Sequence, residues 1–320
     1  MTHLADEGSN NMVNVSFELF PTEDGPARAA LMETARELAG VDPAFVTVTY
    51  GASGTSRDRT LATIAALTEA ISVPVAGHLT TQGATKAEIH EVIDAFASHG
   101  VDHIVALRGD PPAANGATPT APVDGAENVP PAKGYETAAD LVQALRARPD
   151  GARFEISVAA YPEIHPKAAS PQADLDNLKA KIDAGADRAI TQFFFDPELF
   201  LRFRDQVTAA GIGAPLVPGI MPITNLAGIT RMAGRCGAHI PAAVTDRFEA
   251  LEDPDDAEAR RAVAAEVAAE HSARLRAEGV TDFHFYTMNR PALTLAACAV
   301  IGRPAATPAA KASTAGSSPS

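Results

Sequence analysis

Short apolar runs alternate with helical patterns along most of the chain, and this alternation constrains the fold more than any other feature. Eight runs are short enough for buried strands and are followed by segments with helical periodicity. Strict alternation predicts parallel strands joined by right-handed crossovers. The eight predicted strands are Val13–Phe20, Phe45–Tyr50, Val75–Thr80, His103–Asp110, Glu155–Tyr161, Arg188–Phe195, Leu216–Met221 and Phe283–Asn289.

Eight such units favour a closed (β/α)8 TIM barrel, an α/β fold, over an open doubly wound sheet. The dinucleotide-binding pattern G-x-G-x-x-G does not follow an early strand, which weakens the open-sheet alternative. We therefore expect one catalytic barrel domain over residues 13–302, with an extra helix before the eighth strand. Residues 1–12 are predicted to be a flexible N-terminus, and the low-complexity residues 303–320 a disordered tail.

Charge and cysteine content exclude several classes of function. A net charge of −14 disfavours nucleic acid and anionic membranes as partners, because both require a basic surface. Cys236 and Cys298 are the only cysteines and belong to no Cys/His cluster, so we expect neither a disulfide framework nor a metal site. Without a signal peptide or a long apolar run, the sequence predicts a soluble, cytoplasmic protein.

Polar side chains are concentrated where the predicted strands end. In a barrel of this type the carboxyl ends of the strands form the active site. The candidates at these ends are Glu18, Thr49, Tyr50, His78, Thr80, Arg108, Asp110, Tyr161, Glu163, His165, Gln192, Tyr286 and Arg290. A purely structural barrel would not need so many acids, imidazoles and amides there.

Glu18 is the strongest candidate for acid–base chemistry. It lies between Phe17 and Leu19, and apolar surroundings would raise the pKa of its carboxyl group into the range of a general acid. Pairing with a nearby arginine is the alternative. His78 could be a structural histidine, and the amide of Gln192 could cap a neighbouring backbone group.

A second group of polar residues follows the fifth strand. Asp174, Asn177 and Lys181 are spaced by three and four residues, so they share one face of a helix. They could form a solvated face with a salt bridge, or a polar stripe that binds a nucleotide cofactor. The long Pro/Ala/Gly-rich segment 111–134 is predicted to be a mobile loop.

Several segments resemble the bacterial methylenetetrahydrofolate reductase family, in order and from about Val13 to Pro304. They are VSFELFP, FVTVTYGA, GHLT, HIVALRGDPP, ISVAAYPEIHP, ADLDNLKAKIDAGADRAITQFFFD, VPGIMPITN and DFHFYTMNR. The resemblance implies a barrel that binds FAD and passes a hydride from NADH or NADPH to 5,10-methylenetetrahydrofolate. The product would be 5-methyltetrahydrofolate for methionine synthesis and one-carbon metabolism.

The resemblance also implies roles for single residues. Glu18 matches the catalytic acid, and Asp110 matches an aspartate that binds the pterin and lies near the flavin. Gln192 matches an amide used by both substrates, Thr49 matches a position that faces the nicotinamide, and Arg290 matches a folate-binding arginine. The positions that match FAD contacts are Thr49, Tyr50, Ala52, His78, Arg108, Gly109, Asp110, Ala138, Tyr161, His165, Ala168, Asp174, Asn177 and Lys181.

Three residues depart from the family pattern. Ala180, Gly228 and Met232 stand where relatives carry an arginine, a glutamine and a phenylalanine, which affects nucleotide preference and folate affinity. Two alternatives to the reductase are a catalytically silent folate- or flavin-binding barrel and a reductase that takes electrons from a protein partner. The family also implies a homo-oligomer, often a tetramer. The 111–134 loop is longer than in the bacterial relatives, and we expect it to fold over the adenine end of FAD.

Overall fold

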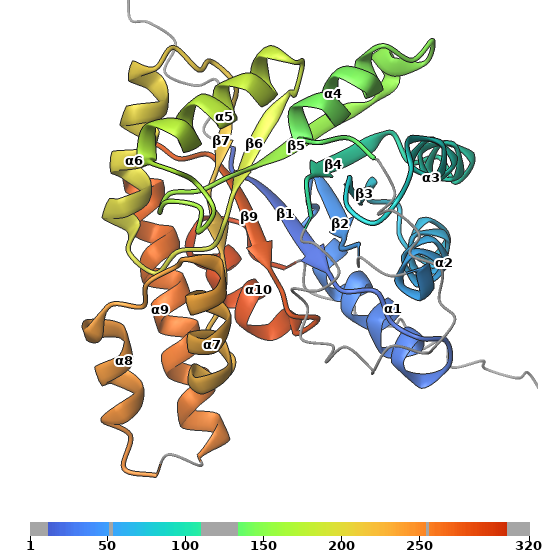
Figure 1. Ribbon diagram of the computed structural model, residues 1–320. Coiled ribbons are helices and arrows are strands. Elements are labelled where there is room, and N and C mark those ends of the chain that lie inside the picture. The colour runs from blue at the N-terminus through green and yellow to red at the C-terminus, as the bar shows by residue number, and fades with distance from the viewer. Residues whose placement is uncertain (1–11, 51–53, 110–133, 254–255, 306–320) are drawn as a thin grey trace, which may run out of the picture.

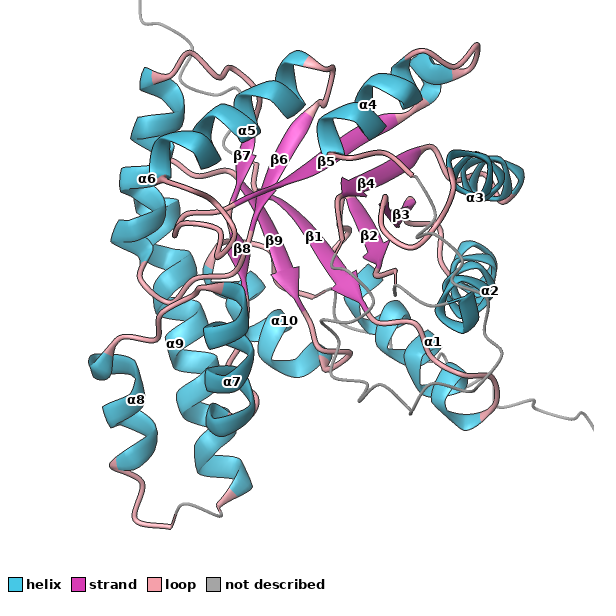
Figure 2. Ribbon diagram, in the orientation of Figure 1, coloured by secondary structure: helices cyan, strands magenta, loops and turns pink. Residues whose placement is uncertain are grey.

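The computed structural model, which describes residues 12–50, 54–109, 134–253 and 256–305, is a barrel of parallel strands surrounded by helices (Figures 1 and 2). All strand pairs are parallel, in the order β7-β6-β5-β4-β3-β2-β1-β9-β8. The strands are β1 Asn14–Leu19, β2 Phe45–Val48, β3 Val75–Thr80, β4 His103–Leu107, β5 Glu155–Ala160, β6 Arg188–Thr191, β7 Leu216–Val217, β8 Gly219–Ile220 and β9 Asp282–Tyr286. The predicted TIM-barrel fold is confirmed.

The predicted seventh strand is divided into β7 and β8 by Pro218. Because proline has no N–H group, it cannot donate a ladder hydrogen bond, but its carbonyl still accepts one from the His284 N–H at 3.0 Å. β7 pairs with β6, and β8 pairs with β9. The two halves therefore close the barrel as a single interrupted strand would.

Helices follow the strands where the sequence predicts them, and their N-termini explain several boundaries. Thr85 and Glu88 form a reciprocal capping box at α3, as Thr137 and Asp140 do at α4. The helices are α1 Pro26–Ala39, α2 Gly54–Ala70, α3 Lys86–Ser98, α4 Ala138–Arg146, α5 Pro171–Asp183, α6 Pro197–Ala209, α7 Leu226–Cys236, α8 Ala242–Glu249, α9 Ala257–Ala277 and α10 Pro291–Val300. The predicted extra helix before the last strand is present, since α7, α8 and α9 all precede β9.

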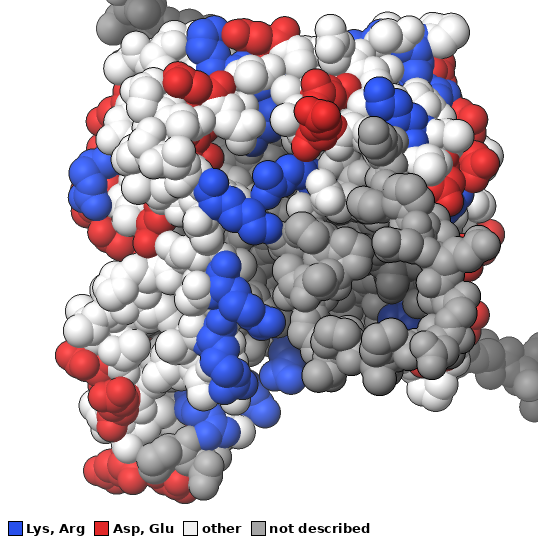
Figure 3. Space-filling model, viewed as in Figure 1, with Lys and Arg blue, Asp and Glu red and all other residues white. Residues whose placement is uncertain are grey.

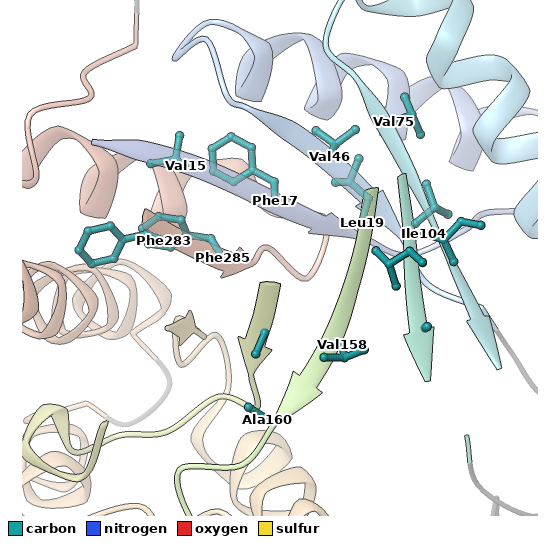
Figure 4. Packing of buried hydrophobic residues seen from close by; sticks show 14 of the residues in the cluster. Val15, Phe17, Leu19, Val46, Val75, Ile104, Val158, Ala160, Phe283 and Phe285 are labelled. Carbon is teal, nitrogen blue, oxygen red and sulfur yellow. The ribbon is translucent and has the colours of Figure 1, made fainter. Parts of the chain in front are cut away.

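Alternation along each strand separates a packing face from a barrel interior. Val15, Phe17 and Leu19 of β1 join the main hydrophobic core between the strands and the helices, together with Phe283 and Phe285 of β9 (Figure 4). Their neighbours Ser16 and Glu18 point the other way, into the barrel. Burial of the packing face therefore fixes which side chains reach the interior.

Four predicted strands are too long by two residues or more: β2, β4, β6 and β9 end at Val48, Leu107, Thr191 and Tyr286. β6 stops at Thr191, since the side-chain oxygen of Gln192 accepts the backbone N–H of Phe193 at 3.0 Å and removes it from the ladder. β2 stops at Val48, so Thr49 and Tyr50 belong to the loop after it. These corrections place the polar residues just beyond the strand ends.

Some predictions concern residues outside the described ranges. The flexible N-terminus over 1–12, nearly all of the 111–134 loop and most of the tail over 303–320 fall there. Arg303, which is described, donates a hydrogen bond to the Val41 carbonyl at 2.5 Å. In the described ranges, none of the helices combines the length and apolar character needed to cross a bilayer.

Candidate active site

The strand register brings inward-facing residues of several strands together at the carboxyl end of the barrel. Glu18 is level with Thr47 of β2 and Tyr286 of β9, and Thr47 is level with Ala76, two residues before His78. Glu18, His78, Gln192, His284 and Tyr286 line one cavity of about 330 Å³, together with Phe20, Val105, Leu107, Val158, Ala159, Tyr161, Ile190, Phe193, Met221, Met232 and Cys236. The cavity is apolar with a few convergent polar groups, as expected of a small-molecule site.

Glu18 is held in its neutral form by this environment. Its side chain is only 10% exposed, and burial raises the pKa of the carboxyl group from 4.5 to about 8. Its Oε2 lies 3.6 Å from Nε2 of His78, but burial lowers the pKa of that imidazole to about 4, so His78 is neutral at pH 7. The pairing with arginine that we considered for Glu18 is not observed among the described residues.

Hydrogen bonds orient the polar groups around Glu18. Nε2 of His78 lies 3.1 Å from the Thr47 hydroxyl, and the Tyr286 hydroxyl donates to the Thr191 carbonyl at 2.7 Å. Gln192 does cap a neighbouring backbone group, as its structural interpretation predicts, but it also lines the cavity. The bond to Phe193 occupies its carbonyl oxygen, so its amide N–H groups are the part available to a ligand.

A second cavity of about 400 Å³ adjoins the first and shares Leu107, Ala159 and Tyr161 with it. It lies at the ends of β4 and β5 and along α5. Nine of the residues predicted to bind FAD line it: Arg108, Gly109, Ala138, Tyr161, His165, Ala168, Asp174, Asn177 and Lys181. Residues from three separate stretches of sequence are therefore brought to one site.

The stripe on α5 is not simply a solvated face. Lys181 is 4% exposed and its Nζ donates to the Ala159 carbonyl at 2.5 Å. Burial lowers the pKa of this ammonium group to about 8, against the opposing effect of the Asp174 carboxylate. Asp174 in turn accepts the backbone N–H of His165 at 2.9 Å, which ties the loop after β5 to α5.

Gly109 turns the chain away from β4 in a conformation that other residues rarely adopt. Its φ is +77°, and a Cβ atom there would lie 2.9 Å from Cβ of Thr80. The buried hydroxyl of Thr80 has no hydrogen-bond partner within the described part of the chain. A close backbone approach next to an unsatisfied hydroxyl is typical of a place where a ligand binds.

Other predicted site residues lie elsewhere. Thr49, Tyr50 and Arg290 are not among the described residues that line either cavity, although each follows a strand at the same end of the barrel. Of the departures from the family pattern, Met232 lines the Glu18 cavity, whereas Ala180 is exposed and neither it nor Gly228 lines a cavity. Asp110 and Ala52 lie outside the described residues.

Several lining residues were missed by sequence reasoning. Lys167 and Thr137 line the second cavity, and Phe193, Met221 and Cys236 line the first. Lys167 could have been found, since it stands between the predicted contacts His165 and Ala168. Apolar side chains such as Met221 carry no comparable signal, because core residues have the same character.

The second cavity fits FAD by the chemistry of its lining. Arg108, Lys167 and Lys181 supply cations for a pyrophosphate, and Asn177 and Asp174 supply hydrogen-bonding groups for a ribose. The adjoining Glu18 cavity has apolar walls suited to a flat ring system. In contrast, no group of His, Cys, Asp and Glu in the described ranges is arranged to hold a metal ion.

Comparison with known proteins identifies one family. The methylenetetrahydrofolate reductase family model matches residues 3–302. Over 290 residues, the chain is 43% identical to the 5,10-methylenetetrahydrofolate reductases of Salmonella typhimurium and Escherichia coli, covering 91% of each chain. It is also 39% identical to the Arabidopsis thaliana methylenetetrahydrofolate reductase (NADH) 1, of which it covers 46%.

A solved structure agrees on the fold. A Clostridium thermocellum protein that binds two copies of 5-methyl-5,6,7,8-tetrahydrofolic acid superposes with a TM-score of 0.57 at 12% identity. The match covers 91% of this chain and 94% of the other. At this level of identity the likeness concerns the barrel fold alone.

Proposed function

The chain belongs to the methylenetetrahydrofolate reductase family, and we propose that it reduces 5,10-methylenetetrahydrofolate to 5-methyltetrahydrofolate by ping-pong hydride transfer from NADH or NADPH through bound FAD. The chemistry that FAD supplies when bound is temporary storage of the hydride between the two substrates. The product would feed methionine synthesis.

The residues of this chain divide between the two cavities. Arg108, Lys181 and Asn177 would hold the phosphates and ribose of FAD, and Gly109 would let the backbone approach the cofactor. The folate and the nicotinamide would take turns in the Glu18 cavity, where the amide of Gln192 can donate to either. Asp110 follows Gly109 directly and would add a negative charge that favours a cationic folate intermediate.

The observation that carries this proposal is the burial of Glu18 in an apolar cavity, where desolvation raises the pKa of its carboxyl group. Opening the five-membered ring of the substrate breaks a C–N bond, and the departing nitrogen requires a proton. The Glu18 carboxyl group donates this proton, which leaves a carboxylate and a cationic iminium that accepts the hydride. The neutral His78 beside it does not draw the proton away, because the pKa of its imidazole is only about 4.

Separate anaerobic half-reactions test the proposal. The purified protein should be yellow, be bleached by NADH or NADPH, and regain its colour with methylenetetrahydrofolate. Glu18→Gln should still be bleached by the nucleotide but should lose the folate step by a factor of about 10² or more. Glu163→Gln is the matched control, because Glu163 follows β5 and accepts the backbone N–H of His239 at 2.9 Å outside the Glu18 cavity.

The same experiment separates the competing functions. A colourless protein that does not bind added FAD would overturn the flavin mechanism and leave a folate-binding barrel. Bleaching by a reduced ferredoxin but not by NADH or NADPH would replace the nucleotide with a protein electron donor. Survival of both half-reactions in Glu18→Gln would show that Glu18 is not the acid.

A further inference from the structure

Two side chains in the segment after β9 continue the pairing between β1 and β9. The backbone register of these strands ends at Glu18 and Tyr286. Beyond this pair, the Asn289 carboxamide bonds both backbone groups of Phe20: its Oδ1 accepts the Phe20 N–H at 2.9 Å, and its Nδ2 donates to the Phe20 carbonyl at 3.0 Å. A carboxamide suits this role because it carries an acceptor and a donor side by side. The side chain therefore extends the pairing by one step that the backbone does not make.

Thr287 holds the other part of the same turn. Its hydroxyl donates to the Glu18 carbonyl at 2.7 Å, whereas its backbone N–H reaches that oxygen only at 3.4 Å. The same hydroxyl accepts the Asn289 N–H at 3.1 Å, so the two side chains form one connected unit. Thr287 is buried, and hydrogen bonds shielded from water are stronger than exposed ones. The backbone of β1 is thus held at Glu18 and again two residues later at Phe20.

The chain adopts an unfavourable backbone conformation to make these contacts. Met288 and Asn289 have φ angles of +52° and +54°, and Asp42 is the only other non-glycine residue with positive φ in the described ranges. Asparagine tolerates this region better than most residues, but methionine does not. Strained conformations persist where surrounding contacts hold them, and they are frequent at active sites. The strain indicates that this turn does more than connect β9 to α10.

The residues that this turn holds belong to the candidate active site. Glu18 and Phe20 both line the cavity of about 330 Å³, and Leu19 between them packs in the core. Pro21 follows directly and has no N–H group with which to extend the ladder. Without the two side chains, the β9 side of β1 would be fixed only up to the level of Glu18.

We propose that Asn289 and Thr287 are positioning residues for the acid Glu18 in the folate step. This inference rests on the proposed function, in which the Glu18 carboxyl group donates a proton to the departing nitrogen of the substrate. The donor must lie within hydrogen-bond reach of that nitrogen, and a misplacement of about 1 Å can cost about 10²-fold in rate. Neither Asn289 nor Thr287 is among the described residues that line the two cavities, so both act through the backbone that carries Glu18.

Half-reactions of the FAD-loaded protein test this role. N289G removes the carboxamide but suits a positive φ, so it separates loss of the hydrogen bonds from backbone strain. At saturating methylenetetrahydrofolate, single-turnover reoxidation of the reduced flavin should slow at least about tenfold. Reduction by NADH or NADPH and the Kd of FAD should stay within about twofold of wild type. Loss of both half-reactions by the same factor would overturn the proposal, because it would indicate a general change of the fold.

Glycine is a better replacement than aspartate because charge matters on this face of the molecule. Met288 packs in one apolar cluster with Leu226 and Met232 of α7, and Figure 3 shows Lys and Arg side chains gathered beside α7. A new carboxylate in N289D would therefore change the local electrostatics as well as the hydrogen bonds. N289G leaves the charge unchanged, so its effect reports the hydrogen bonds.

Thr287 provides a second, conservative comparison. T287V replaces the hydroxyl by a methyl group of similar size, whereas T287S keeps the hydroxyl. T287V should slow the folate step at least about tenfold, and T287S should stay within about threefold of wild type. Equal folate rates in T287V and T287S would overturn the role of the hydroxyl.

A double-mutant cycle shows whether Asn289 acts through Glu18. If it does, E18Q/N289G should reoxidise the flavin no more than about threefold more slowly than E18Q, because the acid that Asn289 positions is already absent. Independent roles would instead multiply the two losses. A multiplied loss would overturn the proposal.

The matched control loosens the same two strands at their other end. Asn14 at the start of β1 donates through its side chain to the Asp282 carboxylate at the start of β9, at 3.0 Å. N14G removes this bond at the end of the barrel opposite Glu18 and should leave both half-reactions within about twofold of wild type. A folate step slowed equally in N14G and N289G would overturn the proposal.

The positioning role and the reductase function fail in different measurements. A wild-type protein whose reduced flavin is not reoxidised by methylenetetrahydrofolate would overturn the reductase function and the role that depends on it. Reoxidation by the wild type together with an unaffected N289G would leave the function and remove the positioning role.

Discussion

Oε2 of Glu18 lies 3.6 Å from Nε2 of His78, yet the two groups do not form a charged pair. Both side chains are buried at the mouth of the barrel, and burial shifts their pKa values in opposite directions, to about 8 for Glu18 and about 4 for His78. Between these values the acid keeps its proton and the imidazole stays neutral. Burial alone thus gives the site a proton donor at physiological pH.

The rate of folate reduction should depend on pH through Glu18. Because the carboxyl group must be protonated to donate, the step should be independent of pH well below 8 and should fall about tenfold per pH unit above it. Stopped-flow measurement of flavin reoxidation by methylenetetrahydrofolate from pH 6 to 10 checks this. A rate that stays level or rises through pH 8 would contradict the assignment.

Glu18 should also reduce stability at high pH. The folded-state pKa is above the unfolded value of 4.5, so the folded state binds more protons between pH 4.5 and about 8, and stability falls as pH rises through this window. Glu18→Gln removes this loss, and we expect the variant to gain roughly 3 kcal/mol relative to wild type between pH 5 and pH 8. Urea unfolding of both proteins at the two pH values measures the difference. Equal pH dependence in the two proteins would show that Glu18 is not buried in a neutral form.

Lys181 should contribute to FAD binding through its charge. Lys181→Gln keeps a donor for the Ala159 carbonyl but removes the cation, and we expect FAD affinity to fall about tenfold or more. Because the pKa of Lys181 is lowered to about 8, wild-type affinity should also decline as pH rises above 8. Lys179→Gln on the same helix is the control, since Lys179 is exposed and pairs with Asp183. Fluorescence titration of apoprotein with FAD would refute the role of Lys181 if both variants bound equally well.

Substitution by alanine should be more harmful at Gly109 than at Gly100. Both residues have positive φ, +77° and +75°, so both substitutions incur a backbone cost of about 1 kcal/mol. Only at Gly109 would the new Cβ meet Thr80, at 2.9 Å, whereas nothing lies within 4 Å of the corresponding position at Gly100. We expect Gly109→Ala to be at least about 1 kcal/mol less stable than Gly100→Ala and to bind FAD more weakly. Thermal unfolding and FAD titration of the pair make the comparison, and equal behaviour would count against a close approach at Gly109.

Alternation of apolar runs and helical patterns was sufficient to predict the barrel, because strand and helix periodicities are local properties of a sequence. Alternation along β1 also predicted the direction of the Glu18 side chain. Phe17 and Leu19 pack in the core between the strands and the helices, so Glu18 faces the barrel interior. The interrupted seventh strand was predicted in its place despite Pro218. Local hydrogen bonds were harder to predict. The predicted sixth strand therefore continued past Thr191, where β6 ends, into the segment in which the Gln192 side chain caps the Phe193 N–H.

Only the tertiary structure decided which candidate residues share a site and how burial shifts their pKa values. The sequence left open whether Asp174, Asn177 and Lys181 form a solvated face, and packing of α5 against β5 buried Lys181 and placed all three beside Arg108. It also brought the Asn289 side chain to the backbone of Phe20, from more than two hundred residues along the chain. Distances across a barrel and the desolvation that sets the pKa of Glu18 depend on all strands at once, and no local pattern encodes them.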